Sequence, residues 1–180
     1  MPTAIDRRFD GSNARCYVYT YKDGVLSKMG HDLKLAVTRF SLTISTAPRV
    51  VEATFDAGSL AVVGVQVDGR DAPTSLTASD RREIETHIIE TLAVKRYPEI
   101  SFRSTLVGPT GPATFRIEGR LRLHGVEQEI ALTAHSLGGE TTVETRLNQP
   151  DFKIPPYRAL FGALRVKADV LVRVVLPMTP

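Results

Sequence analysis

The feature that most constrains the fold of this chain is an alternation of apolar and polar residues that returns in segment after segment. Its longest stretch lies near the end, where every second position is apolar: Leu164, Val166, Ala168, Val170, Val172 and Val174. Successive side chains of a β-strand point to opposite faces, so a period of two predicts strands with one apolar face. We therefore expect a protein built around the apolar face of a β-sheet.

The same alternation, or an apolar run of strand length, marks about eight or nine strands. These segments lie at residues 14–22, 33–44, 51–55, 60–65, 100–104, 115–123, 126–134, 141–147 and 164–174. The apolar phase changes at Thr38-Arg39, which predicts a bend or bulge there. The regular alternation of strands and helices that indicates a parallel sheet does not occur. Many strands joined by short turns are typical of a sandwich or an up-and-down barrel.

One helix is predicted over Ser79–Val94, between the early and the late strands. Thr77 and Asp80 form a capping-box pair, with Asp in place of the usual Glu or Gln. Pro98 disfavours helical geometry at the residue before it and so closes the helix ahead of Tyr97. The apolar face has helical spacing, and the charged residues are expected to face water or the rim: Ile84, Ile88, Thr91 and Leu92 against Arg81, Arg82, Glu85 and Glu90.

Length and charge limit the classes of protein that the chain can belong to. The 180 residues are expected to form a single β-barrel domain over residues 14–177, after a flexible polar tail over residues 1–13. Apolar residues make up 42% of the chain, which is enough for a core and excludes a disordered protein. The formal net charge is only +3, without runs of like charge, so the pattern indicates a solvated surface and no nucleic-acid partner.

The chain carries no sequence signal for export or membrane insertion. Its first residues, MPTAIDRRFDGSNAR, lack the apolar segment of a signal peptide. No window approaches the roughly 18 continuous apolar residues of a membrane span. Cys16 is the only cysteine, so an intrachain disulfide is excluded, and its place in a strand predicts a small buried hydrophobe. We therefore expect a cytoplasmic protein without a transmembrane segment.

The residue types that carry catalysis or bind metals are dispersed along the chain. His87, His124 and His135 lie in separate predicted elements without the spacing of metal ligands. Neither a nucleophile elbow nor a Gly-rich phosphate loop occurs. We predict no metal site, no catalytic residue and no enzymatic activity. Two roles stay open for His31-Asp32: hydrogen bonding to a neighbouring turn, or a polar contact to a ligand head group.

The aromatic residues leave two alternatives open. Tyr17, Tyr19 and Tyr21 share one strand face, where tyrosines usually pack with their hydroxyls in water, although such a row can also stack RNA bases. The phenylalanines either line a ligand cavity or fill a solid core. An inward-facing Phe has the same sequence pattern in both cases.

Several short motifs occur in an order that resembles the YceI-like family. They are Gly30-His31-Asp32, then Tyr97-Pro98-Glu99-Ile100-Ser101-Phe102 with Ser104, then Gly119-Arg120-Leu121 leading to Leu123-His124-Gly125-Val126, and finally Asp151-Phe152-Lys153-Ile154. Each motif is weak alone. The ordered set extends from about Arg15 to Leu176 and is fairly specific.

The resemblance implies an all-β fold with one main helix: an extended antiparallel lipocalin-like barrel of eight strands around a long apolar cavity. It also implies a lipid-like ligand, such as an isoprenoid quinone, a polyisoprenyl or a fatty acyl compound, and no other cofactor. The ligand-binding candidates are His31, Leu33, Leu35, Phe40, Phe102, Phe115, Phe152 and Phe161.

Two features depart from the family pattern. Many relatives resemble secreted proteins with signal peptides, so this chain looks like a cytoplasmic variant. The loop over residues 154–162, IPPYRALFG, is bulky enough to narrow or plug a pocket that is open in relatives.

We therefore predict a non-enzymatic protein that sequesters or transports a long apolar amphiphile in the barrel cavity. The alternative is a structural or regulatory protein-interaction module whose barrel is filled by side chains. A homodimer is expected by analogy with relatives.

Overall fold

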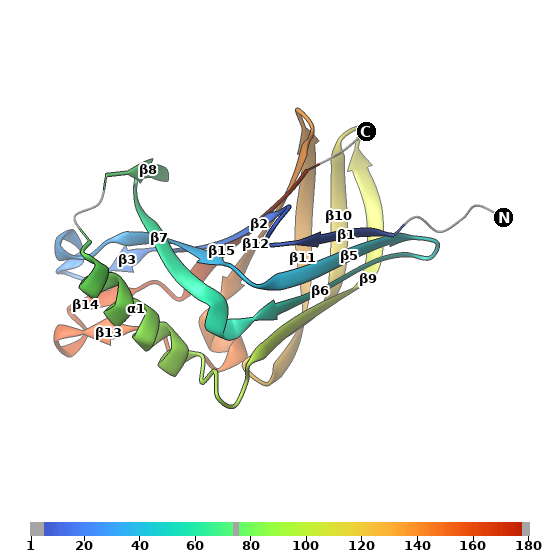
Figure 1. The fold of residues 1–180 in the computed structure, drawn as a ribbon. Coiled ribbons are helices and arrows are strands. Elements are labelled where there is room, and N and C mark those ends of the chain that lie inside the picture. Colours follow the sequence, from blue (N-terminus) through green and yellow to red (C-terminus); the bar gives the residue numbers. More distant parts are fainter. Residues whose placement is uncertain (1–5, 74–75, 178–180) are drawn as a thin grey trace.

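The computed structural model describes residues 6–73 and 76–177 and shows a large, strongly curled antiparallel sheet with one helix (Figure 1). The strands of this sheet are hydrogen-bonded in the order β1-β5-β6-β9-β10-β11-β12-β15-β2-β4-β7-β8. In chain order they are β1 (Arg7–Asp10), β2 (Arg15–Thr20), β4 (Asp32–Val37), β5 (Phe40–Thr46), β6 (Arg49–Asp56), β7 (Leu60–Val67), β8 (Arg70–Ala72), β9 (Glu99–Gly111), β10 (Thr114–Leu123), β11 (Val126–Leu137), β12 (Glu140–Asn148) and β15 (Asp169–Pro177). The predicted antiparallel, mostly β fold with one α-helix is confirmed.

A second, small sheet lies at one side of the large one, at the left of Figure 1. It consists of β13 (Arg158–Ala159), β14 (Leu164–Val166) and β3 (Lys22–Asp23). Short 3₁₀ turns connect the strands at η1 (Ser27–Met29), η2 (Ala57–Ser59), η3 (Gln149–Phe152) and η4 (Leu160–Gly162).

The predicted eight-stranded barrel is wrong in strand number and in closure. The hydrogen-bonded order of the described residues contains twelve strands and has two ends, β1 and β8. A bend in one long hairpin accounts for part of the difference, because it divides the hairpin into the pairs β4/β7 and β5/β6. The sheet therefore curls strongly without forming a closed ladder.

The bend lies at Thr38-Arg39, where the change of apolar phase predicted it. Thr38 N–H donates to Ser59 O at 3.1 Å, and Asp56 N–H donates to Arg39 O at 3.0 Å. These backbone groups at the corner are thus hydrogen-bonded although the sheet bends there. The bend lets apolar residues before and after it point to the same side of the curled sheet.

That inner side carries the core. Along β15 the alternation places Val170, Val172, Val174 and Leu176 inward, as the period of two predicts. Buried residues from distant strands join them, among them Leu42, Phe102 and Ile117. Burial of such apolar surface is the main favourable contribution to folding.

The helix α1 (Ala78–Thr91) is shorter than the predicted Ser79–Val94 at its C-terminal end. The predicted capping box is confirmed: Asp80 N–H donates to Thr77 Oγ1 at 3.1 Å, and Thr77 N–H donates to the Asp80 carboxylate at 2.7 Å. The helix ends before Ala93, whose φ of 46° lies in the left-handed region and breaks the helical path. The left-handed conformation of Ala93 therefore ends the helix before the chain reaches Tyr97-Pro98.

Three motifs that are far apart in sequence meet in one cluster, which we call the clasp: Tyr97, His124, Gly125 and Phe152. His124-Gly125 forms the predicted turn between β10 and β11, with φ values of 52° and 73°. The Tyr97 ring packs edge-on against His124 at 4.9 Å between centroids. His124 Nδ1 donates to Phe152 O at 3.1 Å. The clasp joins the segment after α1 to the β10–β11 turn and to η3.

The predicted tail over residues 1–13 is structured in its second part. β1 pairs with β5 from Arg7↔Ile44 to Asp10↔Ser41, and the turn that follows is closed by Ala14 N–H donating to Asp10 O at 2.8 Å. Phe9 of this strand is buried. The alternating segment around it is too short to predict a strand from the sequence. Residues 1–5 lie outside the described part of the chain.

The clasp predicts that Gly125→Ala destabilises the protein more than Gly138→Ala. Both glycines have positive φ, 73° and 61°, so each substitution costs about 1–2 kcal/mol of left-handed strain. Only at Gly125 would a Cβ meet the Tyr97 ring, at 2.5 Å, whereas nothing lies within 4 Å at Gly138. We expect an additional loss of about 1–3 kcal/mol in the free energy of unfolding, measured by urea denaturation. Equal losses in the two variants, or an excess that persists in a Tyr97→Ala background, would contradict the clasp.

Candidate functional site

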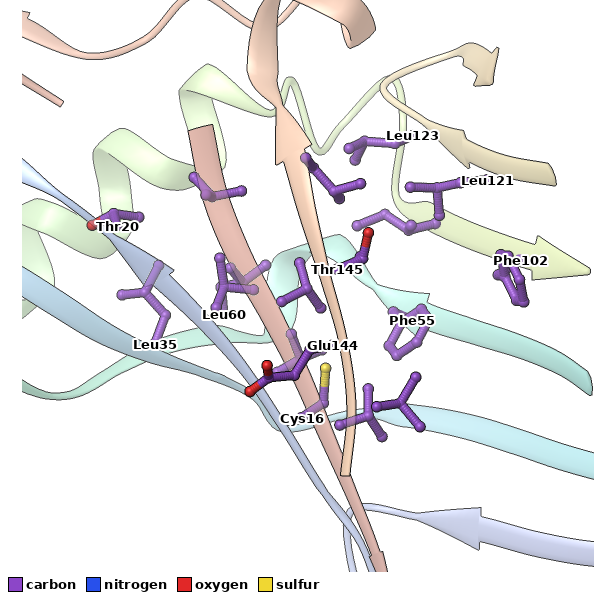
Figure 2. A pocket seen from close by; sticks show the side chains of 18 of the residues that line it. Cys16, Thr20, Leu35, Phe55, Leu60, Phe102, Leu121, Leu123, Glu144 and Thr145 are labelled. Carbon is purple, nitrogen blue, oxygen red and sulfur yellow. The ribbon is translucent and has the colours of Figure 1, made fainter. Parts of the chain in front are cut away.

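A cavity of about 930 Å³ lies between the curled large sheet and α1. Strands from all around the curl contribute to its wall, namely β2, β4, β5, β6, β7, β9, β10, β11, β12 and β15. Figure 2 shows the side chains of Leu35 and Leu60 on one side of the pocket and those of Phe55, Phe102 and Leu121 on the other. Among the labelled side chains, oxygen occurs in Thr20, Glu144 and Thr145. The wall is therefore predominantly apolar, as expected of a site for an apolar ligand.

The structure brings six of the eight ligand-binding candidates to this cavity. They are His31, Leu33, Leu35, Phe102, Phe115 and Phe152. Phe152 is almost fully buried, with 2% of its surface exposed, so its ring is a fixed part of the wall. Whether these six residues contact a ligand stays a prediction.

Two candidates do not line the cavity. Phe40 is buried but packs against Phe55, with 5.9 Å between the ring centroids, and it is Phe55 that reaches the cavity wall. Phe161 is fully exposed in η4, where its φ of 56° turns the chain outward. The other bulky residues of this loop behave differently, because Ile154 and Tyr157 do line the cavity.

The helix supplies part of the wall through Ile84 and Ile88, and Leu92 directly after it contributes as well. Their spacing predicted an apolar helix face, but nothing in the sequence indicated that this face covers a cavity. None of the residues of α1 is fully buried, so the helix is a thin cover and not a core element.

Two charged residues of α1, expected to face water or the rim, instead bind the edge of β7. The Glu85 carboxylate accepts a hydrogen bond from Val62 N–H at 2.8 Å, and Arg81 donates to Val62 O at 3.2 Å. β8 pairs with β7 only at Val65–Val67, so these helix side chains satisfy backbone groups on the edge that β8 leaves uncovered. Covering a strand edge in this way also blocks pairing with another chain.

Polar side chains gather where α1 and the small sheet meet the cavity. Lys22, His31, Asp80, His87 and Arg165 all border it there. The pKa of Asp80 lies below its ordinary value, first because Thr77 N–H and the Thr77 hydroxyl donate to its carboxylate, and to a smaller extent because His31 is near. The His87 ring packs against Tyr157, with 5.5 Å between centroids, and so connects the helix to the segment before β13.

The two candidate roles of the pair His31-Asp32 fall to different residues. The Asp32 carboxylate accepts Lys22 N–H at 2.8 Å, which is a structural bond to a neighbouring strand. His31 is exposed at the cavity rim. Only His31 is therefore placed to contact a ligand head group.

Cys16 lies on the cavity wall and is 3% exposed. Burial raises the pKa of its thiol to about 12, because the thiolate cannot be solvated there. The thiol is thus protonated at neutral pH and contributes apolar surface, as its strand position predicted.

Tyr17 and Tyr19 of the tyrosine row lie on the outer face of β2 and are contacted by cations. Lys34 Nζ lies 4.6 Å from the Tyr17 ring centroid, and the guanidinium of Arg173 lies 5.1 Å from that of Tyr19. Such cation–π contacts occupy ring surface that a stacked base would need. The packing alternative for these tyrosines is therefore favoured over base stacking.

Within residues 6–73 and 76–177, no group of at least three His, Cys, Asp or Glu side chains is arranged to hold a metal ion. The same residues contain no helix that is both long and apolar enough to span a bilayer.

The fold is similar to that of solved proteins. The crystal structure of Burkholderia cenocepacia BcnA aligns with a TM-score of 0.66 at 15% identity, covering 94% of this chain and 99% of that one. A Campylobacter jejuni YceI protein aligns with a TM-score of 0.51 at 15% identity, over 68% of this chain and 71% of that one. At such low identity these likenesses concern the fold alone.

Comparisons of sequence also identify relatives. A UPF0312 protein of Pseudomonas putida (strain W619) is 36% identical over 96 residues, which are 47% of this chain and 50% of that protein. A UPF0312 protein of strain GB-1 is 35% identical over the same shares. The chain thus spans about half the length of the curated relatives that it matches. The family model of the YceI-like domain matches residues 20–177, so this chain belongs to the YceI-like domain family.

Proposed function

We propose that this protein binds a long apolar amphiphile in its cavity and sequesters or transports it without chemical change. The observation that carries the proposal is the cavity of about 930 Å³ with a predominantly apolar wall. Ligand pockets in proteins typically measure about 300–1,000 Å³, and apolar cavities stay dry and accept apolar guests. An isoprenoid quinone, a polyisoprenyl compound or a fatty acyl compound fits this chemistry.

The binding energy would come from removing the ligand's apolar surface from water. That transfer contributes roughly 25 cal/mol for each Å² before the costs of association. Because the contribution is non-directional, the apolar wall selects for length and bulk more than for a chemical group. We infer that the polar groups at the rim, Lys22, His31 and Arg165, contact the head group and set the orientation of the ligand.

The alternative function, an interaction module with a side-chain-filled barrel, is less well supported, because the inner side chains leave a large space unfilled. A homodimer, a cytoplasmic location and a single domain over residues 14–177 remain predictions. The absence of catalytic activity is likewise part of the proposal.

The direct test is extraction of the purified protein with organic solvent, followed by mass spectrometry of the extract. We expect a recurrent apolar amphiphile in amounts approaching one molecule per chain. Repeated preparations that carry no such compound, and that take up none from added fatty acid or quinone, would contradict the proposal.

A cavity-filling variant sharpens this test. Ala134 lines the cavity on β11, whereas Ala131 lies on the outer face of the same strand. We expect Ala134→Phe to lower the co-purified ligand at least severalfold, because the new ring occupies the ligand's space. The same change at Ala131 is the matched control and should leave occupancy unaltered. Overpacking typically costs about 1–3 kcal/mol of folding stability. Thermal unfolding of both variants therefore shows whether a loss of ligand reflects a loss of folding. If Ala134→Phe is folded and retains full occupancy, the ligand is held elsewhere.

The cover formed by α1 generates a second prediction. Glu85→Ala and Arg81→Ala each remove a bond to Val62, so the helix should open more often and admit small molecules to the cavity. We expect N-ethylmaleimide to modify the cavity-facing Cys16 severalfold faster in these variants at a fixed pH. The control is Arg82→Ala. It removes the same kind of side chain one residue further along the helix, at an exposed position. Equal modification rates in all three variants and the unmodified sequence would show that α1 does not limit access.

A further inference from the structure

Exposed apolar side chains gather at two adjoining turns of the small sheet. Phe161 is fully exposed, Leu160 is 54% exposed and Val25 is 88% exposed. The turns are held together by Leu26 N–H, which donates to Ala163 O at 2.9 Å. We call Val25, Leu160 and Phe161 the tip. Exposed apolar groups that cluster in this way mark interaction sites in soluble proteins.

The backbone at the tip is held in an unfavourable conformation. Leu160 and Phe161 have φ values of 49° and 56°, in the left-handed region that bulky residues rarely adopt. Phe161 recovers none of this cost by packing, because its ring is entirely in solvent. Strained residues that persist without a folding benefit are characteristic of functional sites.

The turns and strands that hold the tip are strongly cationic. Residues 21–30 and 157–168 contain five cationic side chains and one carboxylate: Lys22, Lys28, Arg158, Arg165 and Lys167 against Asp23. Their net charge of +4 exceeds the +3 of the whole chain, so the remaining surface is slightly acidic. Asp23 is engaged by Arg165 at 3.1 Å. Hydrophobic residues surrounded by cations match the interface of a bilayer that contains anionic lipids.

The tip also adjoins residues that line the cavity. Leu164 and Val166 on β14 line the cavity, and so does Tyr157 just before β13. The carboxylates of α1 that border the cavity are those of Asp80 and Glu83. A membrane that met the tip would therefore lie beside this part of the cavity wall, next to β13 and β14 at the left of Figure 1.

We propose that the tip docks on the surface of an anionic membrane, with Phe161, Leu160 and Val25 inserted among the head groups. The exposed side chains of Lys28, Arg158 and Lys167 would face lipid phosphates. The role as a loading surface rests on the proposed function, because docking would let an amphiphile pass between the bilayer and the cavity. Docking itself depends only on the tip and its cations.

The test is co-sedimentation of the full chain with phosphatidylcholine vesicles that contain or lack 30% phosphatidylglycerol. We expect binding to the anionic vesicles, weakened by added salt and much weaker on neutral ones. Phe161→Ser should lower the affinity roughly tenfold, since one buried aromatic side chain is lost from the interface. Arg158→Gln should lower it by about fivefold. Leu137→Ser is the matched control, because Leu137 is 87% exposed but lies beside the β11–β12 turn, away from the small sheet.

Several outcomes would overturn the docking proposal. They are equal binding to neutral and anionic vesicles, equal losses in Phe161→Ser and Leu137→Ser, or no vesicle binding at all. Concentration-dependent self-association that Phe161→Ser abolishes, without vesicle binding, would assign the tip to a second copy of the chain. Ala134→Phe should dock like the unmodified sequence. A failure of cavity binding is thereby distinguished from a failure of docking.

Discussion

The contact between the Tyr97 ring and the His124-Gly125 turn fixes the relation between the helix and the large sheet. It leaves no room for a Cβ at position 125, and His124 in turn donates to the backbone of Phe152. The segment after α1, the β10–β11 turn and η3 are therefore held at one point. From there β9 departs into the sheet while α1 lies along the cavity as a cover. Phe152 of the clasp also lines the cavity, so this part of the wall depends on the same placement.

Local patterns in the sequence predicted local structure well. The alternation in β15, the capping box of Thr77 and Asp80 and the turn at His124-Gly125 each depend on neighbouring residues, and each is confirmed. The strand count and closure failed because a hairpin divided at Thr38-Arg39 has the same alternation whether or not the ladder closes. The same distinction between local and long-range features applies to the residues of the site. Phe102 and Phe115 reach the cavity because their strands alternate regularly, whereas Phe161 faces water because of a left-handed turn that no pattern marks. Bonds such as Glu85 to Val62 join residues 23 positions apart and have no local signature.

The distribution of polarity connects the cavity with its surroundings. Aliphatic and aromatic groups form most of the wall, and Cys16 adds to it as a neutral thiol. Cations of the small sheet, Lys22 and Arg165, and carboxylates of α1, Asp80 and Glu83, all border the cavity. The proposed ligand would thus bury its chain inside and leave its head group among charged side chains of both signs.

The central claim is that the space inside the curled sheet holds an apolar ligand. A crystal structure of the protein as purified, without added lipid, tests it most directly. We expect continuous, elongated electron density that passes Phe102, Phe115 and Leu35 and ends near His31. Side chains that have moved inward to fill the space, with no continuous density between them, would contradict it.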